Sequence, residues 1–423
     1  MLRVLSNSWA LLLGMGLLMV GNGLQATLMG VRGGIEGFST LELSLITSAY
    51  FLGFLFGSRA APEMIRRVGH VRVFAALGSL LSAVLILFPV ITDPYVWVLF
   101  RVIVGLCLSG VYVTAESWLN NSATNETRGQ TLSAYMIVQM AGIVTGQAIL
   151  GIGDAASYTI FIIPSVLVSL AFAPILLSIS PTPAFETTKP MSLGELFRNS
   201  PLTFVGMTLL GGVFSALFGM ASVYGTEAGL SVAQISAFVS AIFIGPLVLQ
   251  FPIGWISDRM DRRLLILATA LVGGVAAIGG LAFGASFQAL LVVGFLIGGV
   301  ANPLYSLLIA YLNDYLDPDD MAAASGGLIF INGLGAIAGP VLTGWLMNTF
   351  GPAAGFWGFV ATLMLSIAAY AAYRMTQRPS VPVDETAAYV SVMPTASPVA
   401  LEVATEWAID QADDGMEDTR GAA

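Results

Sequence analysis

The sequence predicts an all-α membrane protein in which twelve transmembrane helices form two parallel-repeat six-helix bundles. Three observations indicate this fold class: apolar runs long enough to cross a bilayer, basic residues concentrated on one side, and an internal repeat. Of the 423 residues, 57% are hydrophobic and 10% are charged, whereas soluble domains carry roughly 25% charged residues. With a mean hydropathy of +0.86, the chain has the composition of a polytopic membrane protein.

Each expected helix contains about the 20 residues that are needed to span a bilayer. The expected ranges are 8–31, 41–65, 72–91, 95–118, 130–152, 158–179, 201–224, 233–256, 263–284, 287–313, 321–348 and 352–374. The first range lacks a cleavage site and is long enough to span, so we expect it to be a signal anchor.

Basic residues predict the orientation of these helices. Of the 16 Lys and Arg residues, Arg32 alone falls on the side of the first loop, and Arg59 and Arg101 fall inside helices. The remaining basic residues all fall on the opposite side of the bundle. Because cytoplasmic loops carry the excess of basic residues, we expect both termini in the cytoplasm.

An internal repeat relates the two halves of the chain. A shift of 192 or 193 residues aligns Gly105 with Gly298 and Tyr112 with Tyr305. The longest loop, rich in proline, lies between the halves and reads as a linker. The expected domains are an N-terminal bundle at 1–179, a cytoplasmic linker at 180–200, a C-terminal bundle at 201–378 and a tail at 379–423.

The tail differs in composition from the rest of the chain. Residues 379–423 hold nine acidic residues and one arginine, a net charge of −8 out of −9 for the whole chain. We expect a disordered cytoplasmic tail with a short transient helix near 399–411, which can be deleted without loss of folding or transport. The two functional interpretations are a docking segment and a solvating tail without a specific function.

A dense group of charges lies between two apolar runs at 254–263. Such a group cannot lie in hydrocarbon, so it marks a membrane face. The spacing G-x-x-x-D-R-x-x-R-R resembles the loop signature of the major facilitator superfamily, except that Asp261 stands where that family usually has its second glycine. The counterpart in the first half keeps Arg67 and Gly69 but has Arg66 in place of the acidic residue.

The resemblance covers residues 8–375, and runs such as Ala115-Glu116-Ser117-Trp118 are similar to uncharacterised bacterial members. It implies a secondary transporter that works by alternating access in the bacterial inner (plasma) membrane. We expect a monomer in the lipid bilayer, with a small-molecule substrate, protons as the coupling ion, and no cofactor or nucleic-acid partner.

In this family, charge pairs at the inner edge hold the cytoplasmic side closed. We expect Glu116 to pair with Arg59, Arg66, Arg67 or Arg72, and Asp314 to lie beside Arg262 and Arg263. The expected gate and charge network comprises Arg66, Arg67, Arg72, Glu116, Gly254, Asp258, Arg259, Arg262, Arg263 and Asp314. The alternative is a set of surface charges, each pair worth ~0–1 kcal/mol.

One face of the fourth expected helix is polar, because Arg101, Gly105, Tyr112 and Glu116 lie within about 80° of one another. Arg101-x-x-x-Gly105 also resembles a motif of the family. Arg101 could bind an anion or set the proton affinity of a carboxylate; the alternative is a paired arginine that joins helices. The substrate cavity candidates are Asn22, Gln25, Arg101, Tyr112, Asn302 and Tyr305, with interhelical hydrogen bonding as the other interpretation.

Glycines at a spacing of four residues predict close helix packing. The run from Gly335 to Pro340 resembles a pattern that antiporters of the superfamily carry on the fifth helix, but here it lies in the second half. Antiport is therefore only suggested, and packing suffices as an explanation. The helix-packing candidates are Gly105, Gly142, Gly146, Gly335, Gly339 and Pro340.

The sequence favours export of amphipathic compounds, because the expected cavity helices carry Met and Phe side chains around few polar groups. The alternatives are uptake of a small anionic metabolite anchored by Arg101, and a non-transporting assembly or sensor protein on the same fold. Glu116 is the nearest candidate for proton coupling. With one His and one Cys in the chain, we expect no catalytic residues and no metal site, and therefore not an enzyme.

Overall fold

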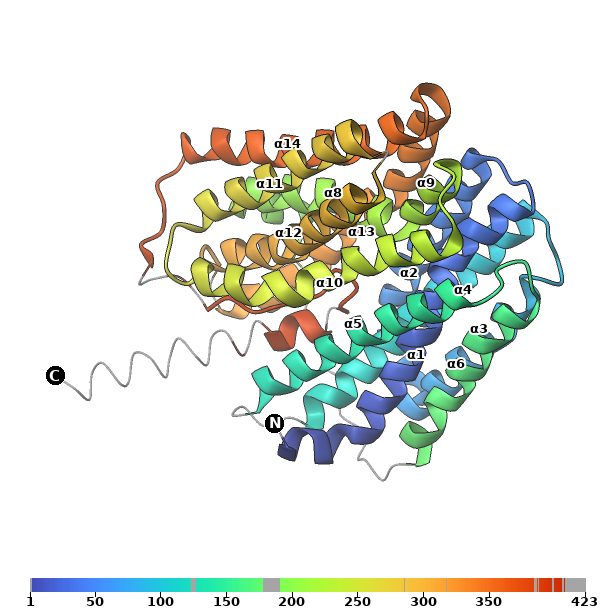
Figure 1. Ribbon diagram of the computed structural model, residues 1–423. Coiled ribbons are helices and arrows are strands. Elements are labelled where there is room, and N and C mark those ends of the chain that lie inside the picture. The colour runs from blue at the N-terminus through green and yellow to red at the C-terminus, as the bar shows by residue number, and fades with distance from the viewer. Residues whose placement is uncertain are drawn as a thin grey trace.

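A computed structural model describes residues 2–122, 127–177, 191–284, 286–316, 318–383, 386, 388–397, 399–404 and 407 (Figure 1). Every element longer than one turn in these ranges is a helix. The first half contains α1 (Leu2–Ile35), α2 (Thr40–Val68), α3 (His70–Leu87), α4 (Pro94–Ser122), α5 (Arg128–Ile152) and α6 (Thr159–Leu177). The second contains α7 (Leu193–Asn199), α8 (Pro201–Ser215), the π-helix η1 (Ala216–Met220), α9 (Ala221–Glu227), α10 (Val232–Ser257), α11 (Arg262–Phe283), α12 (Phe287–Asn313), α13 (Pro318–Phe350) and α14 (Pro352–Met375).

The all-α membrane fold predicted from the sequence is confirmed. Among the described residues, 11 segments are long and apolar enough to cross a membrane, and one of them, Pro201–Glu227, is built from α8, η1 and α9 together. The shorter apolar part of α6, Thr159–Pro174, brings the number of candidate crossings to the expected twelve.

The two halves pack their helices in the same way. In the first half α1 lies against α5 and α2 against α4, and in the second α8 lies against α13 and α10 against α12. Glycines at repeat-related positions permit these contacts: a Cβ at Gly105 would meet the carbonyl oxygen of Tyr50, and one at Gly298 would meet that of Ile242. Small residues let helix backbones approach closely in this manner.

The turn before the second helix of each half is also repeated. Ser39 caps α2 in a capping box with Glu42, and Ser231 caps α10 in the same way with Gln234. A glycine with positive φ precedes each cap by two residues, at Gly37 and Gly229, with φ of 79° and 73°. Glycine adopts this conformation without steric cost, so the same turn forms in both halves.

The chain enters α1 and leaves α14 at the same end of the bundle, which we call the basic end because it carries Arg66, Arg67, Arg262 and Arg263. At the opposite end the two halves touch. Thr40 Oγ1 donates a hydrogen bond to Glu227 Oε1 (3.0 Å). Deeper in the bundle, Ser48 Oγ donates to the carbonyl oxygen of Ile337 (2.6 Å).

At the basic end α5 and α10 flank the C-terminal segment, drawn in red in Figure 1. Its described residues between 388 and 404 are packed against the bundle, which the charge of the tail did not indicate. Eight described side chains between residues 388 and 404 are less than 9% exposed, among them Leu401 (1%) and Ala404 (2%). The reason is that residues 388–404 contain mostly small and apolar side chains, while the acidic residues concentrate before and after them.

The expected linker falls largely outside the described residues, which resume at residue 191. Residues 193–199 form helix α7 rather than an irregular loop. A capping box between Ser192 and Glu195 starts this helix, so its sequence supplies the local signal for helix formation.

Candidate functional site

A central cavity of about 40 Å³ lies between the two halves. Five of its twelve lining residues are aromatic. The cavity is lined by Tyr50, Phe51, Phe54, Leu55, Phe214, Phe218, Ile329, Asn332, Gly333, Ala336, Pro394 and Thr395. The first four belong to α2, the next two to α8 and η1, the next four to α13, and Pro394 and Thr395 to the tail.

The aromatic rings in the second half form a continuous stack. The ring of Phe218 lies parallel to those of Phe214 and Phe243, with centroids 5.4 and 4.8 Å away. Tyr305 packs behind Phe214 at 6.0 Å. The few polar groups of the wall include Asn332, whose Nδ2 donates to the carbonyl oxygen of Met207 (3.0 Å), so its remaining amide oxygen is free to accept.

None of the six residues proposed from the sequence as substrate contacts lines this central cavity. Asn22 and Gln25 line a separate cavity of about 10 Å³ inside the first half. Tyr112 donates to the sulfur of Met19 (3.3 Å) and is buried, and Asn302 and Tyr305 are buried in α12. The repeat identifies the helices near a cavity but not which face of each helix lines it.

The aromatic face of α2 was the functional feature that the sequence prediction missed. Tyr50, Phe51 and Phe54 all line the cavity. A signal was present, because the repeat aligns Phe51 with Phe243, whose ring belongs to the aromatic stack of the second half. Paired aromatic positions in both halves therefore indicate a shared wall better than isolated polar residues do.

Arg101 is held inside the first half, with 4% of its surface exposed. Its Nη1 donates to Gln25 Oε1 (2.8 Å), and its guanidinium lies 4.5 Å from the centre of the Tyr50 ring. Within the described residues, Arg101 Nε and Gln25 Nε2 have no hydrogen-bond partner. The cluster therefore offers two buried donors and no neutralising carboxylate.

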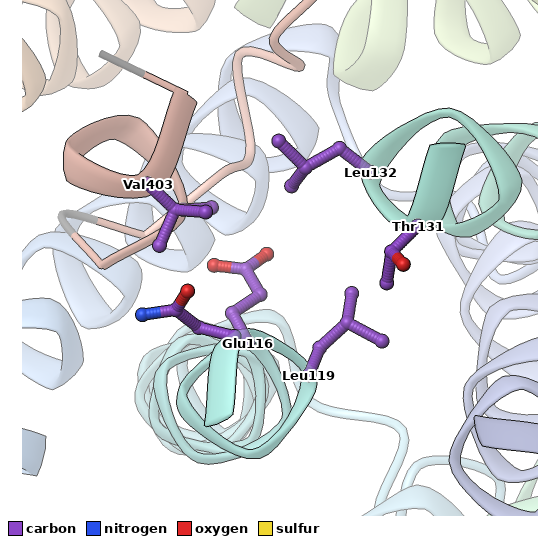
Figure 2. A pocket seen from close by; sticks show the side chains of 7 residues that line it. Glu116, Leu119, Thr131, Leu132 and Val403 are labelled. Atoms are coloured by element: carbon purple, nitrogen blue, oxygen red, sulfur yellow. The ribbon is translucent and has the colours of Figure 1, made fainter. Parts of the chain in front are cut away.

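Glu116 is the one acidic residue that is buried inside a described membrane-spanning helix, with 3% exposed. Its carboxylate accepts hydrogen bonds from Tyr135 Oη (3.0 Å) and from the backbone N–H of Ser397 (2.8 Å). Figure 2 shows the carboxylate in a small pocket among Leu119 of α4, Thr131 and Leu132 of α5, and Val403 of the tail.

The expected ion pair between Glu116 and an arginine is not formed among the described residues. Arg66 and Arg67 both pair with Glu63, one turn earlier on the exposed end of α2, at 2.7 and 2.6 Å. Arg59 lies over the ring of Phe330 at 4.1 Å, and Arg72 is exposed. The arginines pair locally because Glu63 lies three and four residues before them on the same helix face.

The second half contains the buried ion pair expected at the basic end. Arg262 pairs with Asp314, and their side chains are 2% and 3% exposed. Arg262 also donates to Ser257 Oγ (3.2 Å) and to the carbonyl oxygen of Ala310 (3.2 Å). Asp258 lies 3.7 Å from Arg262 and is 41% exposed, so the main partner of Arg262 is Asp314 rather than Asp258.

The other charged residues of the stretch 254–263 interact with nearby groups at the basic end. Arg263 pairs with Asp261 at 2.8 Å and donates to the carbonyl oxygen of Arg378. Burial acts to raise the pKa of Asp261, but the hydrogen bonds and the charge of Arg263 outweigh it and lower that pKa. Arg259 lies over the ring of Trp255 at 4.2 Å.

The tail contacts the second half through several hydrogen bonds. The backbone N–H of Tyr389 donates to Asp258 Oδ1 (2.9 Å), and Gln250 Nε2 donates to Tyr389 Oη (2.9 Å). Val392 N–H donates to Ser306 Oγ (3.0 Å), whose hydroxyl donates back to the Val392 carbonyl (3.2 Å). The Tyr389 ring packs on Gly254, which leaves no room there for a larger side chain.

Beside the tail, a crevice of about 720 Å³ opens between α5 and α10. Its walls include Leu247, Phe251 and Trp255 of α10, and Phe251 and Trp255 are 79% and 54% exposed. Met136 and Ile137 of α5 face them. Because these helices span the membrane, the crevice joins the space around the tail to the bilayer side of the protein.

Two helical bundles of repeated architecture around a cavity at their interface define a membrane transporter of the alternating-access type. The family model described as Major Facilitator Superfamily matches residues 11–241 and again residues 223–405. The chain belongs to this superfamily, and it is a secondary transporter rather than an enzyme.

Bacterial relatives and solved structures agree with this assignment. An "Uncharacterized MFS-type transporter" of Yersinia pestis (strain Pestoides F) is 26% identical over 316 residues, covering 74% of this chain and 81% of its own. The "Uncharacterized MFS-type transporter YcaD" of Escherichia fergusonii is 24% identical over 319 residues, covering 74% and 82%.

The fold is similar to that of two transporters of known structure. The nucleoside transporter NupG superposes with a TM-score of 0.72 at 16% identity, covering 88% of this chain and 99% of its own. A bacterial homologue of the human lysosomal transporter Spinster, in an inward-facing conformation, gives a TM-score of 0.66 at 13% identity, covering 96% and 98%. These likenesses show the fold.

Proposed function

We propose that this transporter exports amphipathic compounds by alternating access, with protons as the coupling ion. The aromatic lining of the central cavity carries the proposal. Five of the wall side chains are aromatic, from Tyr50 and Phe51 on α2 to Phe218 on η1, and few polar groups accompany them. Such surfaces adapt to varied apolar ligands, whereas a sugar or an inorganic ion would need more polar partners.

The crevice between α5 and α10 supports an amphipathic substrate. Its volume of about 720 Å³ lies within the ~300–1,000 Å³ typical of small-molecule sites. Its wall combines the exposed rings of Phe251 and Trp255 with the polar groups of Gln250 and Asp258. A molecule with an apolar body and a polar end can therefore place each part against matching groups.

Glu116 is the proposed proton-coupling residue. A buried carboxylate without a cationic partner is costly in its charged form, and taking up a proton removes that cost. Its described partners, Tyr135 and Ser397, donate hydrogen bonds but carry no charge. Proton uptake at Glu116 would also weaken its hydrogen bond to the tail, because a carboxylate accepts more strongly than a neutral acid.

The basic end is proposed to face the cytoplasm, with the protein a monomer in the bacterial inner membrane. The excess of basic residues at this end supports the orientation. In intact cells an impermeant thiol reagent should label Ile91→Cys, at the opposite end, and spare Val71→Cys, at the basic end; the wild-type residues are 41% and 48% exposed. Labelling of Val71→Cys alone would reverse the orientation.

The substrate class can be tested by a thermal-shift screen on purified protein with amphipathic cations, neutral aromatics and organic anions. We expect stabilisation by amphipathic compounds, and loss of that stabilisation in Phe218→Ala. The matched control is Phe283→Ala, because Phe283 is 67% exposed on α11, away from the cavity. Equal loss in both variants, or hits confined to other classes, would contradict the proposal. An absence of hits from every class would favour a non-transporting role.

Uptake of a small anion is the second candidate function. Its supporting observation is the pair of buried donors without partners, Arg101 Nε and Gln25 Nε2. Against it stands the position of Arg101, which is 4% exposed and separated from the central cavity by Tyr50. Organic anions that stabilise the wild type but not Arg101→Gln would favour this candidate.

A further inference from the structure

We propose that residues 388–404, of which the structure describes all but residue 398, form a built-in plug, which holds the two halves apart at the basic end and occupies part of the substrate cavity. The plug is an autoinhibitory segment that must leave before the transporter can complete its cycle. Four sets of observations support this: the contacts with both halves, the apolar anchor, the volume of the cavity and the position of the plug between moving helices.

The plug is fastened to one carboxylate of each half. At one end the N–H of Tyr389 donates to Asp258 Oδ1 (2.9 Å), at the C-terminal end of α10. At the other end the N–H of Ser397 donates to Glu116 Oε2 (2.8 Å), on α4. Hydrogen bonds to charged acceptors are the stronger class, and together these two bridge the halves through the plug.

Between and beyond these two bonds, the plug buries apolar side chains. Val392 and Met393 are 6% and 7% exposed, and Leu401 and Val403 are 1% and 3% exposed. Leu401 and Val403 lie on a short helical stretch at 399–404, which packs near Glu116 and α5 (Figure 2). A solvated tail would leave such side chains in water, so their burial favours a specific docked state.

The plug leaves little room for a substrate. With Pro394 and Thr395 in its wall, the central cavity measures about 40 Å³, far below the ~300–1,000 Å³ of small-molecule sites. A solute of ordinary size therefore fits the aromatic wall only after the segment around Thr395 has moved away. The plug and the substrate are thus expected to compete for the same space.

The plug also blocks the change of state. Alternating access requires the basic ends of the two bundles to approach each other when the opposite ends separate. Residues 388–404 lie between α5 and α10, where this approach takes place. Met136 of α5 contacts the plug directly, since Ser391 Oγ lies 2.9 Å from its sulfur.

The rate at which a cysteine in the central cavity is labelled reports whether the plug blocks the cavity, and this measurement does not require a known substrate. The reporter is Ala336→Cys, which lines the central cavity, in a Cys107→Ser background that removes the only native cysteine. Deletion of residues 388–423 should raise the rate of labelling by N-ethylmaleimide about tenfold or more. A tenfold change corresponds to ~1.4 kcal/mol, which is within the range of one hydrogen bond to a charged group.

A point variant guards against indirect effects of the deletion. Leu401→Asp places a charge at a site that is 1% exposed and should raise the labelling rate like the deletion. The matched control is Val383→Asp, which introduces the same charge at a site that is 40% exposed, before the plug begins. It should leave the rate unchanged. Equal rates in the wild type, the deletion and Leu401→Asp would overturn the proposal.

A disulfide tests whether the plug is docked in the membrane-embedded protein. Met136→Cys with Ser391→Cys should cross-link under mild oxidation in native membranes and thereby lose reactivity toward a maleimide-polyethylene glycol. Adding Leu401→Asp should reduce the cross-linked fraction several-fold. If the pair forms no cross-link, or if Leu401→Asp leaves its yield unchanged, then residues 388–404 do not form the plug.

Discussion

Removal of the Asp314 charge should destabilise this protein more than removal of the neighbouring Asp258 charge. Asp314 and Arg262 form an ion pair whose side chains are 3% and 2% exposed. Asp314→Asn keeps the size of the side chain but removes the main counter-charge of a buried guanidinium, which retains only the more distant Asp258 among its described acidic partners. Breaking a buried pair in this way costs roughly 3–5 kcal/mol.

Asp258→Asn is the matched comparison, because it makes the same chemical change one contact away. Asp258 is 41% exposed and lies 3.7 Å from Arg262, so its ion pair is worth ~0–1 kcal/mol. The amide oxygen can still accept the hydrogen bond from the Tyr389 backbone. The family signature suggests Asp258 as the main acid of this group, whereas the geometry assigns that role to Asp314.

The double variant Arg262→Met with Asp314→Leu separates the charge effect from the loss of contacts. Replacing both charges removes the buried cation together with its main counter-charge. It leaves the described acceptors, Ser257 Oγ and the Ala310 carbonyl, without their donor, at a cost of about 1–3 kcal/mol. Asp258→Asn should therefore destabilise the protein least, the double variant more, and Asp314→Asn most. Equilibrium unfolding in mixed detergent and SDS, followed by tryptophan fluorescence, measures each difference. A double variant less stable than Asp314→Asn would refute the reasoning.

Two further predictions follow from the structure. The lowered pKa of Asp261 beside Arg263 means that its contribution to stability is present above the ordinary value of 3.8 and is lost as the pH falls through the lower folded value. The difference in unfolding free energy between the wild type and Asp261→Asn should therefore shrink on going from neutral pH to about pH 3, and a constant difference would contradict this. Gly105→Val should reduce the yield of folded protein, because a Cβ there meets the Tyr50 carbonyl; Gly358→Val, which meets nothing, should not.

The fold could be predicted from the sequence because a bilayer imposes simple rules. Segments that cross it must be helical, apolar and about 20 residues long, and these properties are visible without tertiary contacts. The nearly constant offset of the internal repeat also predicted that the two halves have the same architecture. Gly105 and Gly298 indeed occupy equivalent helix contacts. The π-helix η1 left no such signal, since no Pro or polar cluster marks residues 216–220.

The candidate site was less predictable, because it depends on which face each helix presents. Asn22 and Gln25 are polar residues on the expected helix, yet they line a cavity inside the first half instead of the interface. The burial of the described residues between 388 and 404 was not predicted, for a different reason. The average charge of the tail indicates disorder, but every charge except that of Glu402 lies outside residues 388–404, and a property averaged over 379–423 conceals the apolar segment.

The two halves differ at the basic end, and the tail compensates for that difference. In the second half an arginine, Arg262, neutralises the buried acid Asp314. The first half has Arg66 where the family has an acidic residue, and this arginine pairs with Glu63 at the surface, away from Glu116. Glu116 is thus left with neutral donors only, and one of them is the backbone of Ser397 in the tail. Loss of the plug would therefore remove one of the two hydrogen bonds of a buried carboxylate and favour its protonation. Under the proposed mechanism, release of the tail and proton uptake at Glu116 would be coupled steps, since each would make the other more favourable.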